Sequence, residues 1–247
     1  MSLVEIVAIN GYIQNTYLAV YPDKLLLLDA GCRSDVIPIL TYITDILQRP
    51  VTQLKAVLIS HMHPDHAGGA RLLQQKTGCQ IMASAAAEHW YHGIKGRMQH
   101  IVDLALTYYV ASRQGKSMTN LWYQPILKAD KHLTDGEYVP GFEDWQVVST
   151  PGHTNCDLSF WHQPSKQLYS GDLILKIKHK LVSPLVINFT QAYKASLAKV
   201  RALQADYVLL AHGGRVVIDD EAFATLMQVA PDTPRKMKLL TALKLKK

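Results

Sequence analysis

One short stretch of the chain, Leu58–Gly69, constrains its fold and chemistry more than any other. It places His61, His63, Asp65 and His66 within six positions, directly after a short apolar run. An apolar run that ends in polar groups is typical of a buried strand that delivers side chains to the edge of a sheet. Alternate residues of an extended segment point the same way, so His61 and His63 can share one metal ion. The next two ligand-capable residues lie where the chain must turn, and can aim at a neighbouring point.

The spacing of this stretch favours a metal site over three unrelated surface histidines, although a lone histidine is more often a surface or core residue. Imidazole and carboxylate ligands together suit zinc first, with iron and manganese as alternatives.

Other ligand-capable residues follow predicted strands in the same way. His153 comes after Trp145–Ser149, Asp172 after Leu168–Ser170, and His212 after Tyr207–Leu210, each beside a glycine. If these strands end at one edge of a sheet, their terminal residues converge, and the glycines let the backbone come close. Asp29 likewise ends the strand Leu25–Leu28.

The pattern of strands followed by alternating helices and strands predicts an α/β (α+β) fold with helices covering at least one sheet face. The 247 residues fit a single domain, 1–247. Ser34 and Thr190 are expected to cap helices that run to about Leu47 and Leu203. The other predicted elements are strands Val4–Ile9, Tyr12–Val20, Ala56–Ser60, Gln80–Ala83 and Leu158–Trp161, hairpin turns at Asn10-Gly11 and Tyr21–Lys24, a helix from Ala70 to near Gly78, and amphipathic helices over Glu221–Val229 and Arg235–Leu245.

A helical, aromatic segment of about residues 84–132 interrupts this pattern and is expected to be an insertion. Its aromatic residues could line a pocket over the site, but residues at helical spacing more often pack among themselves, and we favour packing. They are Trp90, Tyr91, Tyr108, Tyr109, Trp122 and Tyr123. We assign no ligand role to His89, His92 and His100, and expect His132, His162 and His179 on the surface.

Composition and charge point to an ordinary globular protein. Hydrophobic residues make up 48% and charged residues 19% of the chain. The net charge of +6 comes from six basic residues from Arg235 onward, which leaves 20 basic and 20 acidic residues in the rest, so nucleic acid is disfavoured. Three scattered cysteines, with no signal-peptide pattern or membrane-length apolar run, predict free thiols, no membrane contact and a cytoplasmic protein.

The motif His61-x-His63-x-Asp65-His66, taken with the downstream ligands, resembles the metallo-β-lactamase superfamily over essentially the whole chain. The resemblance implies a four-layer αββα sandwich with a two-metal site at one edge, and a helical insertion at about 84–132. It assigns the first metal to His61, His63 and His153, the second metal to Asp65, His66 and His212, and the bridging position to Asp172. Asp29 would support the ligands from behind.

The function expected from this resemblance is hydrolysis of an ester, thioester or lactone in a small-molecule acyl substrate. Two divalent metal ions, zinc first and iron or manganese as alternatives, would share a hydroxide that attacks the carbonyl, and Asp65 would handle the proton. The bridging Asp172 argues against a true β-lactamase and for the glyoxalase-II, lactonase or nuclease branches. Three alternative functions stay open: a metal-dependent phosphodiesterase or nuclease, an iron-dependent persulfide-dioxygenase-like enzyme, and a non-catalytic ligand-binding protein. A homodimer is also possible.

Two further features have two interpretations each. Cys156 lies close to His153 and could be a thiolate ligand, but a small buried residue at the start of a strand is favoured. The alternation of basic and apolar residues over Lys176–Lys180 predicts one strand with a basic face. That face could clamp a carboxylate or phosphate, or could simply be a solvated edge.

Overall fold

The computed structural model describes residues 5–235, which divide into two compact units between His132 and Leu133. In the described residues each unit contains a six-stranded sheet with helices, which confirms the mixed α/β class. The predicted helix over Arg235–Leu245 lies, after its first residue, outside the described residues, and the single domain over 1–247 stays a prediction. None of the helices in residues 5–235 has both the length and the hydropathy needed to cross a bilayer.

The sheet of the first unit has the strand order β1-β2-β3-β4-β5-β6. Strands β1 to β3 are antiparallel, and both predicted turns are confirmed by backbone hydrogen bonds, from Gly11 N to Gln14 O and from Tyr21 N to Lys24 O. Strands β3 to β6 are parallel. The strands are β1 (Glu5–Asn10), β2 (Asn15–Val20), β3 (Leu25–Leu28), β4 (Leu54–Ile59), β5 (Gln80–Ala83) and β6 (Lys131–His132).

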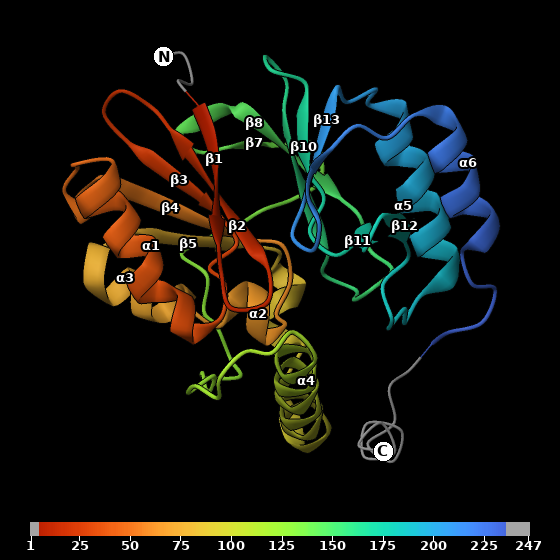
Figure 1. Cartoon of the computed structure of the whole chain (residues 1–247), viewed down its shortest axis with the longest axis horizontal. Helices are drawn as coiled ribbons and strands as arrows, with labels where there is room; N and C mark the ends of the chain where they lie inside the picture. Colours follow the sequence, from red (N-terminus) through yellow and green to blue (C-terminus); the bar gives the residue numbers. More distant parts are fainter. Residues whose placement is uncertain (1–4, 236–247) are drawn as a thin grey trace. The chain divides into compact units, whose positions relative to one another are not determined.

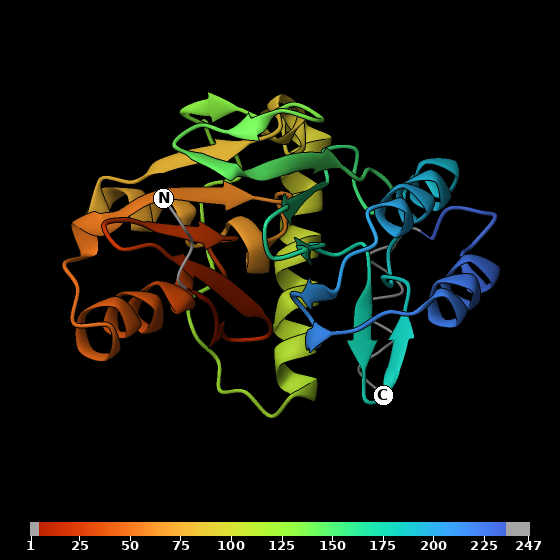
Figure 2. The ribbon, with the colours of Figure 1, turned by 90° about the horizontal axis from the view of Figure 1, so that it is seen from above.

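Helices α1 and α3 flank this sheet (Figures 1 and 2). All four leucines of β3 are fully buried, as a parallel strand covered on both faces requires. The helix that follows the metal motif ends at Gly78, which takes the left-handed conformation as the sequence predicts. The helical elements are η1 (Arg33–Asp35), α1 (Val36–Thr41), η2 (Tyr42–Ile46), η3 (Val51–Gln53), α2 (Pro64–Ala67), α3 (Ala70–Thr77), η4 (Ala85–His89) and α4 (Gly93–Arg113).

The start of the first helical segment differs from the prediction. Cys32, not Ser34, occupies the N-cap, and the segment opens with the 3₁₀ turn η1. The carboxylate of Asp35 accepts hydrogen bonds from the backbone N–H groups of Cys32 and Tyr12, each at 2.7 Å. The buried Asp35 therefore ties the helix start to the β1–β2 loop, a tertiary contact that local capping rules do not reveal.

The loops that follow β3 and β4 are joined by backbone hydrogen bonds. Ala30 N donates to His66 O at 2.8 Å, and Gly69 N donates to Gly31 O at 3.0 Å. A Cβ at Gly69 would lie 2.5 Å from Ala30 O, so only glycine lets the two backbones approach this closely. This junction positions the metal motif against the end of β3.

The sheet of the second unit has the strand order β14-β13-β10-β9-β8-β7. Strand β10 is parallel to β13 and antiparallel to β9, which is antiparallel to β8, so β8, β10 and β13 run the same way. The strands are β7 (Tyr138–Val139), β8 (Phe142–Ser149), β9 (Leu158–His162), β10 (Gln167–Tyr169), β13 (Tyr207–Leu210) and β14 (Gly214–Val216).

Helices α5 (Thr190–Ala202) and α6 (Asp220–Val229) pack beside this sheet (Figure 1). The predicted cap at Thr190 is wrong: Phe189 is the N-cap, and the Thr190 hydroxyl donates to Asp232 O instead. The expected surface position of His162 is also wrong. Its ring is buried, with Nε2 3.1 Å from an Asp144 carboxylate oxygen.

The basic segment after Asp172 is a hairpin rather than one strand. Strands β11 (Leu175–Ile177) and β12 (Lys180–Val182) pair antiparallel, with Ile177 opposite Lys180 and Lys176 opposite Leu181. Directly opposed residues share a face, so Lys176 and Lys180 point to opposite faces. The predicted single basic face therefore does not form, because a turn reverses the chain within the alternating pattern.

The Gly69 junction gives a prediction about stability. Gly69→Ala should lower the free energy of unfolding by about 2–4 kcal/mol, since the added Cβ meets backbone atoms that cannot move aside. Gly136→Ala is the control: its φ is +81° but no atom lies within 4 Å of the added Cβ, so its cost should be about 1 kcal/mol. Urea unfolding of both variants measures the difference, and equal losses would contradict the close approach.

The buried Asp35 gives a prediction about pH. Burial raises the pKa of its carboxyl group from 3.8 to about 6, so the folded chain holds this proton more tightly than the unfolded chain. Its contribution to stability is fully present below about pH 4 and is lost as pH rises through about 6, by up to about 3 kcal/mol. Between pH 4 and 7 the melting temperature of the wild type should fall relative to that of Asp35→Asn, which cannot titrate. The same pH dependence of the melting temperature in the wild type and in Asp35→Asn would refute this.

Candidate metal centre

The first unit places four predicted ligands just beyond the end of β4 and in the short helix α2. The ligand atoms of His61 and His63 lie within 4.8 Å of each other, as do those of Asp65 and His66. The Nε2 of His61 is 3.1 Å from the Nδ1 of His63. Two nitrogens about 2.0–2.1 Å from a tetrahedral cation lie about 3.3 Å apart, so this pair is close to the spacing that zinc needs.

A buried carboxylate holds these ligands from behind. Asp29 is fully buried and accepts three hydrogen bonds of 2.7 Å, from Ser60 N, from the Ser60 hydroxyl and from His66 Nδ1. Asp29 has φ +59°, a conformation rare for residues other than glycine, and the hydrogen bonds explain why it is tolerated. Because a carboxylate only accepts, the His66 proton sits on Nδ1 and the Nε2 lone pair is left for a metal.

The adjoining Ser60 hydroxyl acts in the same way on His61. The Ser60 hydroxyl donates its only proton to Asp29. In its 3.0 Å contact with His61, the Ser60 oxygen therefore accepts and the imidazole Nδ1–H donates. That fixes the lone pair of His61 on Nε2, the atom that faces His63. The sequence predicts the supporting role of Asp29, but it gives no signal for the role of Ser60.

The second unit places the other three predicted ligands after β8, β10 and β13, as the sequence predicts. His153 donates from Nδ1 to Val186 O at 2.6 Å, so its Nε2 is the ligand atom. The loop that carries it is tied by Asp157, whose carboxylate accepts from the backbone N–H and the hydroxyl of Thr154. Burial raises the pKa of Asp157.

Asp172 lies between two histidines of this unit. Its Oδ2 is 3.6 Å from His153 Nε2, and its Oδ1 is 3.5 Å from His212 Nε2. The Asp172 carboxylate thus presents one oxygen to each of two imidazoles. This arrangement lies entirely within the second unit.

The donor atoms fit hard or borderline cations. The two units supply imidazole nitrogens and carboxylate oxygens, the set typical of catalytic zinc, iron and manganese sites. Among residues 5–235, Cys156 joins no cluster of ligand-capable atoms. It is buried, and its Sγ is 3.2 Å from the Thr154 hydroxyl, which fits the favoured interpretation of a small residue at the start of β9.

The sequence pattern does not identify one acidic residue that lies beside a predicted ligand. Asp103, in the middle of α4, lies 3.6 Å from the Nε2 of His63. The sequence predicts a helix in this segment but gives no sign of which residue meets the metal motif forty positions earlier. The aromatic residues of the segment 84–132 differ in burial. Tyr91 and Tyr123 are buried, as the packing interpretation requires, whereas Trp122 is exposed.

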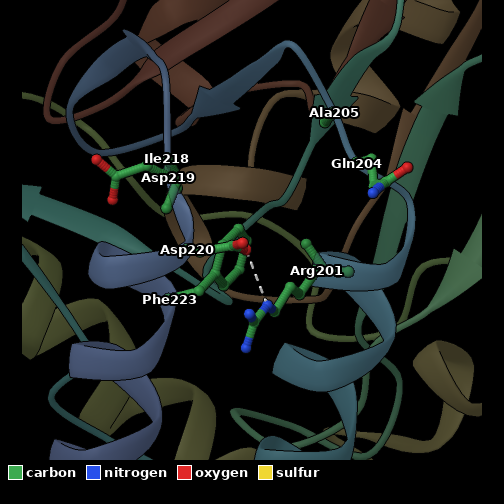
Figure 3. Close-up of a pocket in the computed structure, with 8 residues that line it drawn as sticks. Arg201, Gln204, Ala205, Ile218, Asp219, Asp220 and Phe223 are labelled. Carbon is green, nitrogen blue, oxygen red and sulfur yellow. Dashed lines mark hydrogen bonds and ion pairs between the residues drawn. The ribbon is translucent and has the colours of Figure 1, made fainter.

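A separate pocket of about 250 Å³ lies between α5 and α6 in the second unit (Figure 3). An ion pair of 3.1 Å between Arg201 and Asp220 lies at this pocket, but both side chains are largely exposed, so solvent screens it. No predicted ligand lines the pocket, and we assign it no role in the chemistry. Its lining residues are Val200, Arg201, Gln204, Ala205, Ile218, Asp219, Asp220 and Phe223.

Comparison with known proteins agrees with this geometry. The family profile of the Metallo-beta-lactamase superfamily matches residues 9–212, which include all the predicted ligands. The chain belongs to this superfamily.

Individual relatives are distant. The chain is 27% identical over 153 residues to a hydroxyacylglutathione hydrolase of Bdellovibrio bacteriovorus, covering 62% of this chain and 44% of that protein. It is 25% identical over 199 residues to the beta-lactamase-like protein 2 homolog of Drosophila melanogaster, covering 81% and 58%. The chain thus spans about half the length of these relatives. A metallo-beta-lactamase superfamily protein of Sulfolobus tokodaii has a similar structure, with a TM-score of 0.66 at 18% identity over 97% of this chain and 93% of that one.

The Asp29 network predicts a loss of metal affinity on substitution. Asp29→Ala removes the acceptor that orients His66 and Ser60, and should weaken metal binding about 10–100-fold. Asp130→Ala is the matched control, since Asp130 also accepts a backbone N–H and a side-chain donor in this unit, from Ile81 and Gln74, each at 2.7 Å. Competition with a chromophoric chelator measures both variants. Equal affinities would contradict the orienting role.

Proposed function

We propose that this chain is a metal-dependent hydrolase that cleaves an ester, thioester or lactone bond in a small-molecule acyl substrate. The observation that carries the proposal is the position of Asp172, with one carboxylate oxygen directed to His153 and the other to His212. A site that bridges two cations is suited to hydrolysis. Membership of the superfamily, and the hydrolases among its relatives, support the proposal.

The proposed ligand set is the one that the family resemblance implies. His61, His63 and His153 would hold one divalent cation, and Asp65, His66 and His212 a second, with Asp172 shared. Zinc is the first candidate, with iron and manganese as alternatives. Two cations held by these residues would supply a water that is deprotonated near neutral pH and a Lewis acid for the carbonyl oxygen.

The ligand charges favour an anionic transition state. Two carboxylates offset only two of the four positive charges of a pair of divalent cations, because the five imidazoles are neutral. A developing oxyanion or a leaving thiolate is therefore attracted to the site. Asp65, nearly buried and 3.8 Å from His66 Nε2, is our choice for handling the proton.

The proposed substrate is a small acyl compound, and a thioester is the first to test. The hydroxyacylglutathione hydrolase among the relatives supports a thioester. A nucleic acid substrate is disfavoured because the chain before Arg235 has 20 basic and 20 acidic residues, which leaves little charge for a phosphate backbone. A cytoplasmic location is part of the proposal and is supported by the three cysteines, which are buried and form no disulfide within residues 5–235.

The test begins with metal analysis of protein purified without added metal, followed by turnover of thioesters, lactones, simple esters and phosphodiesters. We expect two metal ions per chain and metal-dependent cleavage of at least one acyl class. Two metals with no acyl cleavage would overturn the reaction. A single iron with oxygen-dependent turnover would replace the proposal with an oxygenase, and phosphodiester cleavage alone would replace it with a nuclease.

A substitution tests the bridging role itself. Asp172→Ala should lower metal content and reduce kcat/KM about 100-fold or more, since it removes a ligand shared by both cations. Asp144→Ala is the matched control, because Asp144 also contacts a buried imidazole, that of His162, but is no predicted ligand. Its metal content and activity should match the wild type. Full activity in Asp172→Ala would show that the bridging assignment is wrong.

A further inference from the structure

Helix α4 carries a carboxylate to the back of a predicted metal ligand. Asp103 lies near the middle of this 21-residue helix, which packs against α2, the helix that follows His63. The Oδ2 of Asp103 is 3.6 Å from His63 Nε2, and the two side chains are only 8% and 13% exposed. The contact is therefore largely shielded from solvent, so the electrostatic interaction of the carboxylate with the imidazole is weakly screened.

Asp103 is itself held in place by two donors. The Tyr91 hydroxyl donates to its Oδ2 and the Gln99 side-chain amide to its Oδ1, both at 2.7 Å. Burial raises the pKa of Tyr91 well above its usual value, so the phenol keeps its proton and remains a donor. With both oxygens engaged, the carboxylate has a fixed orientation toward His63.

A glycine lets the backbone of Tyr91 lie against the first turn of the helix. A Cβ at Gly96 would lie 2.2 Å from the backbone carbon of Tyr91, so a larger residue would displace Tyr91, the donor to Asp103. A second contact comes from the chain after the helix: the Tyr123 hydroxyl donates to Met62 O, in the residue between His61 and His63. The segment from Tyr91 to Tyr123 thus contacts both the ring and the backbone of the metal motif.

The two nitrogens of His63 face different partners. Nδ1 is directed to His61 Nε2 at 3.1 Å, and Nε2 is directed to Asp103. A carboxylate near Nε2 stabilises the tautomer with the proton on that nitrogen, which leaves the lone pair on Nδ1. Asp103 lies on the far side of the ring from His61, so it is placed to orient the ligand rather than to bind the same cation.

We propose that Asp103 is the positioning residue of His63, and that the helical segment of about residues 84–132 serves the metal centre by holding this carboxylate. The inference rests on the proposed function only in taking His63 as a metal ligand. It assigns α4 a role in metal affinity that is separate from any contact with substrate.

The test measures metal affinity and ligand geometry without substrate. Asp103→Asn should weaken binding of cobalt(II), measured by competition with a chelator, about 10–100-fold, and should alter the visible absorption spectrum of the cobalt protein. Tyr91→Phe, which keeps the ring and removes only the donor to Asp103, should weaken binding less and shift the spectrum the same way. Restoring carboxylate chemistry with Asp103→Glu should recover part of the affinity.

The matched control is Tyr108→Phe, which removes a phenol on the same helix that donates to Thr119 O and accepts from Leu121 N rather than bonding to Asp103. Its affinity and spectrum should equal those of the wild type. Wild-type affinity and spectrum in both Asp103→Asn and Tyr91→Phe would overturn the inference, as would equal losses in Tyr108→Phe. A wild-type protein that binds two metals but cleaves no acyl substrate would overturn the proposed reaction and leave this inference standing.

Discussion

The carboxylate of Asp29 joins two loops that come from neighbouring parallel strands, and the arrangement of the metal motif depends on it. Asp29 follows β3 and Ser60 follows β4, and the register that places Leu28 beside Leu58 brings both to one edge of the sheet. Removed from water, the carboxylate must find donors, and it finds them in Ser60 and His66. The buried Asp29 carboxylate thus links the end of β3 to the loop after β4 and to the candidate ligand His66.

The same physical device recurs across the candidate ligands. An acceptor fixes the outer nitrogen of three of the five rings: Ser60 for His61, Asp29 for His66, and the Val186 carbonyl for His153. Asp172 then stands between His153 and His212 without help from the first unit. Each unit therefore shapes its own share of the ligand set through its own sheet edge and its own hydrogen bonds.

Much of the fold could be predicted from the sequence because local patterns decide it. The leucines of β3 and the left-handed Gly78 follow from burial and backbone sterics alone. Features that depend on tertiary contacts were predicted wrongly or missed. The helical segment with the predicted cap at Ser34 starts at Cys32 instead, because the Asp35 carboxylate accepts from both Cys32 and Tyr12, and a turn divides the lysine-rich segment into two strands.

The places of the candidate ligands could be predicted because they follow strands, and sequence pattern reveals where a strand ends. Asp103 could not, since it is an acid within a helix, and only packing shows which side of the helix meets His63. Ser60 was missed for a similar reason: a serine at the end of a strand has many uses, and its neighbours decide among them.

The locked imidazoles carry a consequence for how the protein acquires its cations. In small zinc domains the ion organises the polypeptide, so loading and folding are one event. Here buried protein groups set the ring orientations within each unit, so the rotational freedom of the ligands is lost during folding, before any ion arrives. Exchange of one metal for another would then leave the scaffold intact, and the identity of the ion would be decided by supply and coordination preference rather than by the survival of the fold.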